Sequence, residues 1–127
     1  MRKKILVIDD EELLVKTFAR LLEKVNYDVR VASRPEDAIA MAEKEDFDLV
    51  LCDIRMPGKN GVETIREMQA ARERKGRKST PVIFLTGFAD PKLEREAQAL
   101  SPVAYIYKPF DTEKLLILID SSVREPA

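Results

Sequence analysis

The chain has 127 residues, of which 45% are hydrophobic, and this suits a single domain with one sizeable core. Lysine and arginine (22) nearly balance aspartate and glutamate (23), so the net charge of −1 gives no overall attraction to nucleic acid or to a membrane. Histidine is absent, which excludes a serine–histidine triad, a histidine zinc site and a phosphohistidine donor.

The cysteine content and the start of the chain favour a cytoplasmic protein. Cys52 is the single cysteine, so no internal disulfide is possible. The apolar run after Met1 extends over Ile5–Ile8 before four acidic residues interrupt it, which is too short for a signal peptide or a membrane span. We therefore expect one domain over residues 1–127, with no membrane contact.

Strand-like apolar runs alternate with stretches of helical periodicity about five times along the chain. The first run, Ile5–Ile8, precedes a helix that ends at Asn26. Its apolar positions recur at intervals of three and four, which predicts one buried stripe. The stripe consists of Leu13, Leu14, Thr17, Phe18, Leu21, Leu22 and Val25.

The second and third strands are predicted at Asp28–Ala32 and Leu49–Asp53. Between them, Ser33 and Glu36 have the spacing of a capping box, with Pro35 in the first turn of the second helix. The third strand is apolar at consecutive positions, as expected when helices cover both faces of a parallel sheet.

Caps and prolines define the second half of the chain. Asn60 with Glu63 predicts the start of a third helix, Asp90 before Pro91 that of a fourth, and Asp111 that of a fifth. The remaining strands are predicted at residues 82–85 and 104–107. The whole pattern is that of a (βα)5 domain.

Residues suited to phosphoryl chemistry follow four of the predicted strands. They are Asp9 with Asp10, Asp53, Thr86 and Lys108. Because the carboxyl ends of parallel strands share one edge of the sheet, we expect these side chains to converge there.

Three converging carboxylates are the ligands that a hard divalent cation such as Mg²⁺ prefers. The alternative is that Asp9 and Asp10 merely cap the first helix, although repulsion from Asp53 then needs another explanation. Asp53 beside the cation is placed to act as a nucleophile toward phosphorus, with Thr86 and Lys108 offsetting the charge of the oxygens. Taken alone, Thr86 could simply end a strand and Lys108 could be a solvated surface residue.

The ordered set of motifs resembles the receiver domains of bacterial two-component response regulators. The similarity covers essentially the whole chain and is carried by residues 5–12, 49–58 with Asn60 and Gly61, 81–87 and 104–110. It implies an α/β, flavodoxin-like (βα)5 three-layer sandwich with a parallel five-stranded sheet of order 2-1-3-4-5.

The resemblance also implies roles for the acidic residues. Asp53 is similar to the phosphoacceptor of the family. Asp9 and Asp10 match the acidic pair that holds Mg²⁺ together with Asp53, and the main-chain carbonyl of Arg55 matches a further metal ligand.

A switch is implied in the same way. Thr86 and Lys108 would contact the phosphoryl group, and Lys108–Pro109 would be a cis peptide that aims the lysine into the pocket. Thr86 would move toward phosphorylated Asp53, and Tyr105 would then turn inward. The alternative for Tyr105 is an aromatic ring that simply packs.

The function that this resemblance implies is a signalling switch rather than a turnover enzyme, although the domain assists its own phosphorylation and dephosphorylation. The phosphoryl donor would be a sensor histidine kinase or a histidine phosphotransfer protein. The face of the fourth helix, fifth strand and fifth helix would contact a downstream protein or output domain, or a second copy of the chain, without direct nucleic-acid binding.

The sequence allows two alternatives to this function and disfavours two others. The chain could be a receiver cut from a larger transcriptional regulator or hybrid kinase, or an interaction module that works without phosphorylation. A haloacid-dehalogenase-type phosphohydrolase needs two aspartates two residues apart in one loop, which Asp9 to Glu12 lack. A flavin-binding protein is disfavoured because four acids would repel the flavin phosphate.

Four further parts of the chain carry expectations of their own. The Arg55 side chain is expected in solvent, with reach toward the phosphoryl site as the alternative, and Gly87 should leave the pocket open. On the last helix, Leu115, Leu116 and Ile119 form the inner face, with Ile117 on the wet side. The five basic residues within 72–78 are expected to form a solvated loop.

Overall fold

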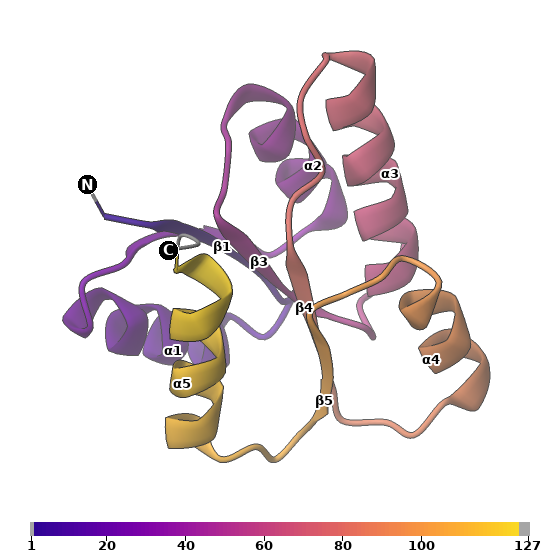
Figure 1. Cartoon of the computed structure of the whole chain (residues 1–127). Coiled ribbons are helices and arrows are strands. Elements are labelled where there is room, and N and C mark those ends of the chain that lie inside the picture. The colour runs from indigo at the N-terminus through magenta and orange to yellow at the C-terminus, as the bar shows by residue number, and fades with distance from the viewer. Residues whose placement is uncertain (1, 125–127) are drawn as a thin grey trace.

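The computed structural model describes residues 2–124, and within them five strands alternate with five helices (Figure 1). The strands are β1 (Lys4–Ile8), β2 (Asp28–Ala32), β3 (Leu49–Asp53), β4 (Val82–Thr86) and β5 (Ala104–Tyr107). The helices are α1 (Glu12–Lys24), α2 (Pro35–Lys44), α3 (Gly61–Arg74), α4 (Pro91–Gln98) and α5 (Thr112–Val123). None of these helices is both long and apolar enough to cross a membrane.

The strands form one parallel sheet in the order β2-β1-β3-β4-β5, which confirms the predicted flavodoxin-like architecture. The chain goes from β1 to β2 on one side and then returns to β3 on the other, so the strand order reverses beside β1. Ile8 pairs with Cys52 and Asp53 pairs with Leu85, so these strands end at nearly the same level. Ligands of such sheets bind at the carboxyl ends beside the reversal.

Helices cover both faces of the sheet: α1 and α5 lie on one face, and α2, α3 and α4 on the other (Figure 1). Alternate residues of β1 serve the two cores, with Leu6 and Ile8 toward α2, α3 and α4, and Ile5 and Val7 toward α1 and α5. Each fully buried aliphatic side chain contributes about 1.5–3 kcal/mol of transfer free energy. The predicted three-layer sandwich is confirmed.

Helix caps agree with the sequence at three of the four predicted sites. Asn60 forms a capping box with Glu63, and the carboxylates of Asp90 and Asp111 accept from backbone N–H groups of α4 and α5. The capping box at Ser33 was a wrong prediction. Helix α2 begins one residue later than the box requires, so Arg34 takes the N-cap position without a side-chain hydrogen bond.

The predicted buried stripe of α1 is wrong for most of its residues. The buried side chains of α1 are Val15, Ala19 and Leu22, whereas Leu13 is 81% exposed. Both sets of residues have helical spacing and lie side by side on the helix, so periodicity alone did not distinguish them. As a consequence, α1 presents apolar side chains to solvent near its N-terminus.

The prediction of a solvated loop for the basic residues of 72–78 is wrong at Arg72. Helix α3 continues through Arg74, and Arg72 is 3% exposed. On α5 the prediction is confirmed, because Leu115 and Ile119 are buried, Leu116 is half-buried and Ile117 is 70% exposed.

Candidate functional site

The polar residues that follow the strands meet at one edge of the sheet. Asp9 comes directly after β1, Asp53 and Thr86 end β3 and β4, and Lys108 comes directly after β5. The Lys108 ammonium lies 3.3 Å from Asp9 Oδ2 and 3.6 Å from Asp53 Oδ1. Its backbone N–H donates to the Thr86 carbonyl at 2.7 Å. The expected convergence of these strand ends is therefore present.

Three carboxylates form an acidic cluster in this pocket. One oxygen from each of Asp9, Asp10 and Asp53 lies within 4.8 Å of the others. Asp9 and Asp53 are buried and Asp10 is exposed. Oxygen ligands on two separate loops, with one side open to solvent, suit a hard divalent cation.

The loop after β1 is held by hydrogen bonds of Asp9. Its backbone N–H donates to the Ala32 carbonyl at 3.2 Å, and its Oδ1 accepts from the Glu11 N–H at 3.0 Å. Helix α1 itself has no side-chain cap at Glu11. The alternative in which Asp9 and Asp10 serve to cap this helix therefore accounts for one oxygen of Asp9 and leaves the rest of the cluster unexplained.

The electrostatics of the cluster favour a bound cation. Burial first, and then the neighbouring Asp9 carboxylate, raise the pKa of Asp53 from 3.8 to about 6. Burial lowers the pKa of Lys108, but the carboxylates of Asp53 and Asp9 outweigh it and raise that pKa above 10.5. The single positive charge of Lys108 does not balance the negative charges of Asp9, Asp10 and Asp53. A divalent cation would supply the missing positive charge.

The Thr86 hydroxyl is engaged with the loop that follows β4. Thr86 is 1% exposed, and its Oγ1 accepts from the Phe88 N–H at 3.1 Å and donates to the Phe88 carbonyl at 3.3 Å. The hydroxyl therefore forms its hydrogen bonds with the backbone two residues further along the chain.

Tyr105 is half-buried, with its ring against Phe84 and Tyr107 at centroid distances of 6.3 and 5.6 Å. Its hydroxyl is buried and has no hydrogen-bond partner among residues 2–124. Burial, and then the charge of Glu94, raise the pKa of this phenol. Within the described residues, the Tyr105 hydroxyl is thus a buried polar group without a protein partner.

Two features near the pocket escaped the sequence analysis. The first is Phe88, whose ring lies under the Arg55 guanidinium at 4.3 Å. An aromatic residue two positions after Thr86 was the available signal. The Lys108–Pro109 peptide is cis, as the resemblance to receiver domains implied.

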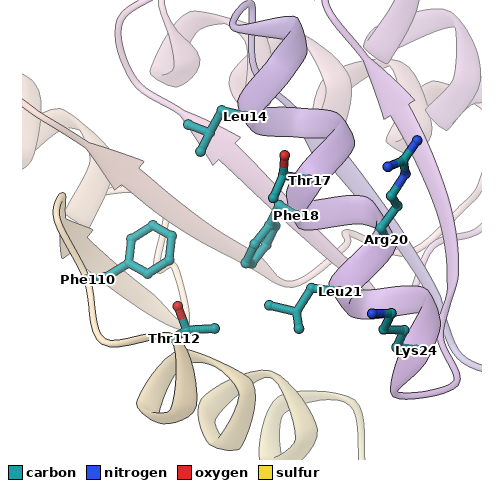
Figure 2. Close-up of a pocket in the computed structure, with 8 residues that line it drawn as sticks. All are labelled: Leu14, Thr17, Phe18, Arg20, Leu21, Lys24, Phe110 and Thr112. Atoms are coloured by element: carbon teal, nitrogen blue, oxygen red, sulfur yellow. The ribbon is translucent and has the colours of Figure 1, made fainter.

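The second feature is a groove of about 450 Å³ between α1 and the start of α5 (Figure 2). Its walls are the apolar side chains of Leu14, Phe18, Leu21 and Phe110, and Arg20 and Lys24 lie along α1 at its rim. Phe18 and Phe110 meet edge to face, with centroids 6.0 Å apart. The two walls of the groove follow residues of the acidic pocket along the chain: α1 begins two residues after Asp10, and Phe110 comes two residues after Lys108. The sequence analysis missed this groove because it predicted Leu14, Phe18 and Leu21 to be buried.

The profile of the response regulator receiver domain family matches residues 5–120. The chain belongs to this family. The transcriptional regulatory protein ResD of Bacillus subtilis is 31% identical over 95% of the chain, and ZraR of Salmonella typhimurium is 32% identical over 87%. The chain spans 48% of ResD and 24% of ZraR, about half or less of these curated relatives.

Solved structures agree with this assignment. A CheY-like receiver domain protein from Methanospirillum hungatei superposes with a TM-score of 0.87 at 28% identity, covering 97% of this receiver and 94% of that chain. A response regulator from Burkholderia pseudomallei, solved with a phosphorylated aspartic acid and a calcium ion, gives 0.80 at 27% identity, covering 95% and 68%. Receiver domains are signalling domains that bind a divalent metal at an acidic pocket and interact with histidine kinases and output domains.

Proposed function

We propose that the receiver spans residues 1–127 and is switched by phosphorylation of Asp53, with a sensor histidine kinase or histidine phosphotransfer protein as donor. The observation that carries this proposal is the meeting of Asp9, Asp10, Asp53 and Lys108 at the strand ends, where Lys108 lies within 3.6 Å of Asp53. Asp53 has a pKa of about 6 and is ionised at neutral pH, as a nucleophile must be.

The metal in this proposal is Mg²⁺, held by Asp9, Asp10, Asp53 and the main-chain carbonyl of Arg55. When bound, Mg²⁺ neutralises the carboxylates and the oxygens of the transferring phosphoryl group. The cluster fits such an ion because its oxygens converge and its charge is uncompensated.

The protein groups then divide the chemistry. An Asp53 oxygen bonds to phosphorus while the phosphorus–nitrogen bond of a phosphohistidine breaks, and the imidazole leaves with that electron pair and takes up a proton. Lys108, already beside Asp53, pairs with a phosphoryl oxygen. Thr86 gives up its bond to the Phe88 carbonyl and donates to another. Water later attacks the phosphorus, the bond to the Asp53 oxygen breaks, and inorganic phosphate leaves with Asp53 restored as a carboxylate. In this proposal the chain assists its own phosphorylation and dephosphorylation and is no turnover enzyme.

The apolar groove of α1 is the proposed docking surface for the donor (Figure 2). Its two walls continue directly from the loops that carry Asp10 and Lys108, so a helix seated there has its histidine close to Asp53. Leu14, Phe18 and Phe110 offer apolar contact, and Arg20 and Lys24 favour an acidic edge on the donor.

The output surface is proposed to be the face formed by α4, β5 and α5. Movement of Thr86 would change the packing of Tyr105, whose hydroxyl already lacks a partner among the described residues. The face would then contact a downstream protein, an output domain or a second copy of the chain in the cytoplasm. The exposed side chains of Tyr107 and Ile117 offer it apolar contacts.

A small phosphoryl donor tests the acceptor directly. Incubation with phosphoramidate and Mg²⁺ should add one phosphoryl group to the wild type and none to Asp53→Asn, as measured by intact mass. Asp37→Asn is the matched control, because Asp37 is an exposed acid remote from the pocket in sequence, and it should be modified like the wild type. Equal modification of Asp53→Asn and the wild type would contradict the proposal, and an unmodified wild type would favour an interaction module independent of phosphorylation.

A further inference from the structure

A stacked pair of side chains joins two of the loops that follow the strands at the acidic site. Arg55 lies in the loop after β3, two residues beyond Asp53, and Phe88 lies in the loop after β4, two residues beyond Thr86. The Arg55 guanidinium lies 4.3 Å from the centroid of the Phe88 ring. Both residues are exposed, and the Phe88 ring is 52% exposed. The contact therefore ties together the two loops that flank the phosphoryl site.

The choice of partner by Arg55 is unexpected on charge alone. Asp53 lies two residues before Arg55, and Asp9 and Asp10 share the acidic cluster with Asp53, yet within residues 2–124 Arg55 forms no ion pair or hydrogen bond with these carboxylates. An arginine stacks well on an aromatic face because its guanidinium is planar and weakly hydrated. The ring of Phe88 thus holds a cation at the rim of an acidic site.

The backbone of Phe88 connects this stack to Thr86. Its N–H donates to the Thr86 hydroxyl at 3.1 Å, and its carbonyl accepts from the same hydroxyl at 3.3 Å. As long as the Phe88 backbone stays in this position, the Thr86 hydroxyl donates its proton to the Phe88 carbonyl and to no other acceptor. Arg55, Phe88 and Thr86 form one connected unit.

We propose that the Arg55–Phe88 stack is a latch that holds the Thr86 hydroxyl on the Phe88 backbone until a phosphoryl group on Asp53 draws Arg55 away. This inference rests on the proposed function, because the phosphoryl group is what opens the latch. Phosphorylation adds about −1.5 to −2 charge and three acceptor oxygens. Arg55 and Thr86 can then both donate charge-assisted hydrogen bonds to the phosphoryl oxygens, which are stronger than their contacts with Phe88.

The latch is weak enough to be opened by this event. A cation–π contact at an exposed site is worth a two- to fivefold factor in an equilibrium constant, from the roughly 0.5–1 kcal/mol of such contacts. A charge-assisted hydrogen bond to a phosphoryl oxygen is stronger than that. The latch therefore sets a threshold for the switch without preventing it, and its release leaves the Phe88 ring free at the entrance to α4.

The test compares beryllofluoride, a mimic of the phosphoryl group, in four variants with Mg²⁺ present. Phe88→Leu removes the ring but keeps an apolar side chain, so it should bind beryllofluoride about two- to fivefold more tightly than the wild type. Phe88→Tyr keeps the ring face and should bind like the wild type. Arg55→Gln removes the latch together with the cation that reaches the phosphoryl group, so its gain should be smaller than that of Phe88→Leu.

Arg66→Gln is the control for loss of one positive charge, since Arg66 is exposed on α3 and has no ion pair among the described residues. NMR supplies a readout that is independent of affinity. The Arg55 δ-methylene signals should be shifted upfield by the Phe88 ring in the wild type, and should return to ordinary values with Mg²⁺ and beryllofluoride but not with Mg²⁺ alone.

Equal beryllofluoride affinity in wild type and Phe88→Leu would overturn the latch while leaving the proposed function intact. Arg55 signals that are the same in both proteins before ligand is added, or that stay shifted in the beryllofluoride complex, would also overturn it. If the wild type shows no saturable response to beryllofluoride, the proposed function fails and the latch fails with it.

Discussion

Two buried charged sites in this receiver have opposite surroundings. The Arg72 guanidinium, at the C-terminal end of α3, donates four hydrogen bonds at distances between 2.8 and 3.0 Å. Its acceptors are the carbonyls of Ala42, Glu45 and Lys78 and the carboxylate of Asp46. At the other end of the sheet Asp53 lies among acids, and its pKa is raised to about 6. Removing one partner from a well hydrogen-bonded buried charge destabilises a fold, whereas a charge held at electrostatic cost marks a place where a ligand is expected.

The Arg72 site can be broken by removing the donor. Arg72→Met keeps much of the volume but leaves three carbonyls without this donor, so we expect a loss of about 3 kcal/mol in the free energy of unfolding. Chemical denaturation would measure it. Arg74→Met is the matched control, two residues along the same helix at an exposed position, and should change stability by less than about 0.5 kcal/mol. Equal effects in the two variants would show that the hydrogen bonds of Arg72 do not stabilise the fold.

The backbone that supports Asp53 can be disturbed at Gly61. A Cβ atom at this position would lie 2.2 Å from the main-chain oxygen of Asp53, so α3 and the strand end have no room for it. Gly61→Ala should therefore destabilise the protein by about 2–3 kcal/mol and weaken Mg²⁺ binding. Gly87→Ala is the control, because a Cβ there meets nothing within 4 Å. A Gly61→Ala protein with wild-type stability and metal affinity would contradict this account.

Removing the charge of Asp53 should raise the free energy of unfolding, whereas the Arg72 and Gly61 substitutions should lower it. Its pKa is raised on folding, so the native state binds the proton more tightly and loses stability as the pH rises from 3.8 to about 6. Asp53→Asn should therefore be more stable than the metal-free wild type by about 2 kcal/mol at pH 7, and by nothing below pH 3.8. Thermal unfolding at both pH values measures this difference. A destabilised variant at pH 7 would show that the acidic cluster is not under electrostatic strain.

Bound Mg²⁺ should offset the destabilisation that the ionised Asp53 carboxylate causes. Because its ligands must be ionised, the affinity for Mg²⁺ should fall by up to about tenfold per pH unit below pH 6, where Asp53 takes up its proton. Titration calorimetry of the wild type and Asp53→Asn would measure the two pH profiles. The profile of the variant should be flatter, and parallel profiles would assign the titration to another group.

The sequence was most informative where position along the chain determines position in space. Parallel strands place their carboxyl ends at one edge, so the convergence of Asp9, Asp53, Thr86 and Lys108 could be predicted from four apolar runs. The cap at Asn60 was also predictable, because its partner Glu63 is only three residues away along the chain.

The features that the sequence did not reveal depend on packing between distant segments. Nothing local to Arg72 indicates that the end of α2 and the loop before β4 will surround it. In α1 two neighbouring stripes have the same spacing, and the sheet alone decides that Val15 rather than Leu14 is buried. The stack of Arg55 on Phe88 joins two loops, for which no periodic pattern exists.

The most direct test of the central claim is an amide NMR titration with Mg²⁺ and beryllofluoride on the wild type and on Asp53→Asn. We expect saturable shifts at Asp10, Asp53, Thr86 and Lys108 that extend to Tyr105 in the wild type and are absent from the variant. No response of a folded wild-type protein to either addition, or the same response in Asp53→Asn, would contradict a switch driven by phosphorylation of Asp53.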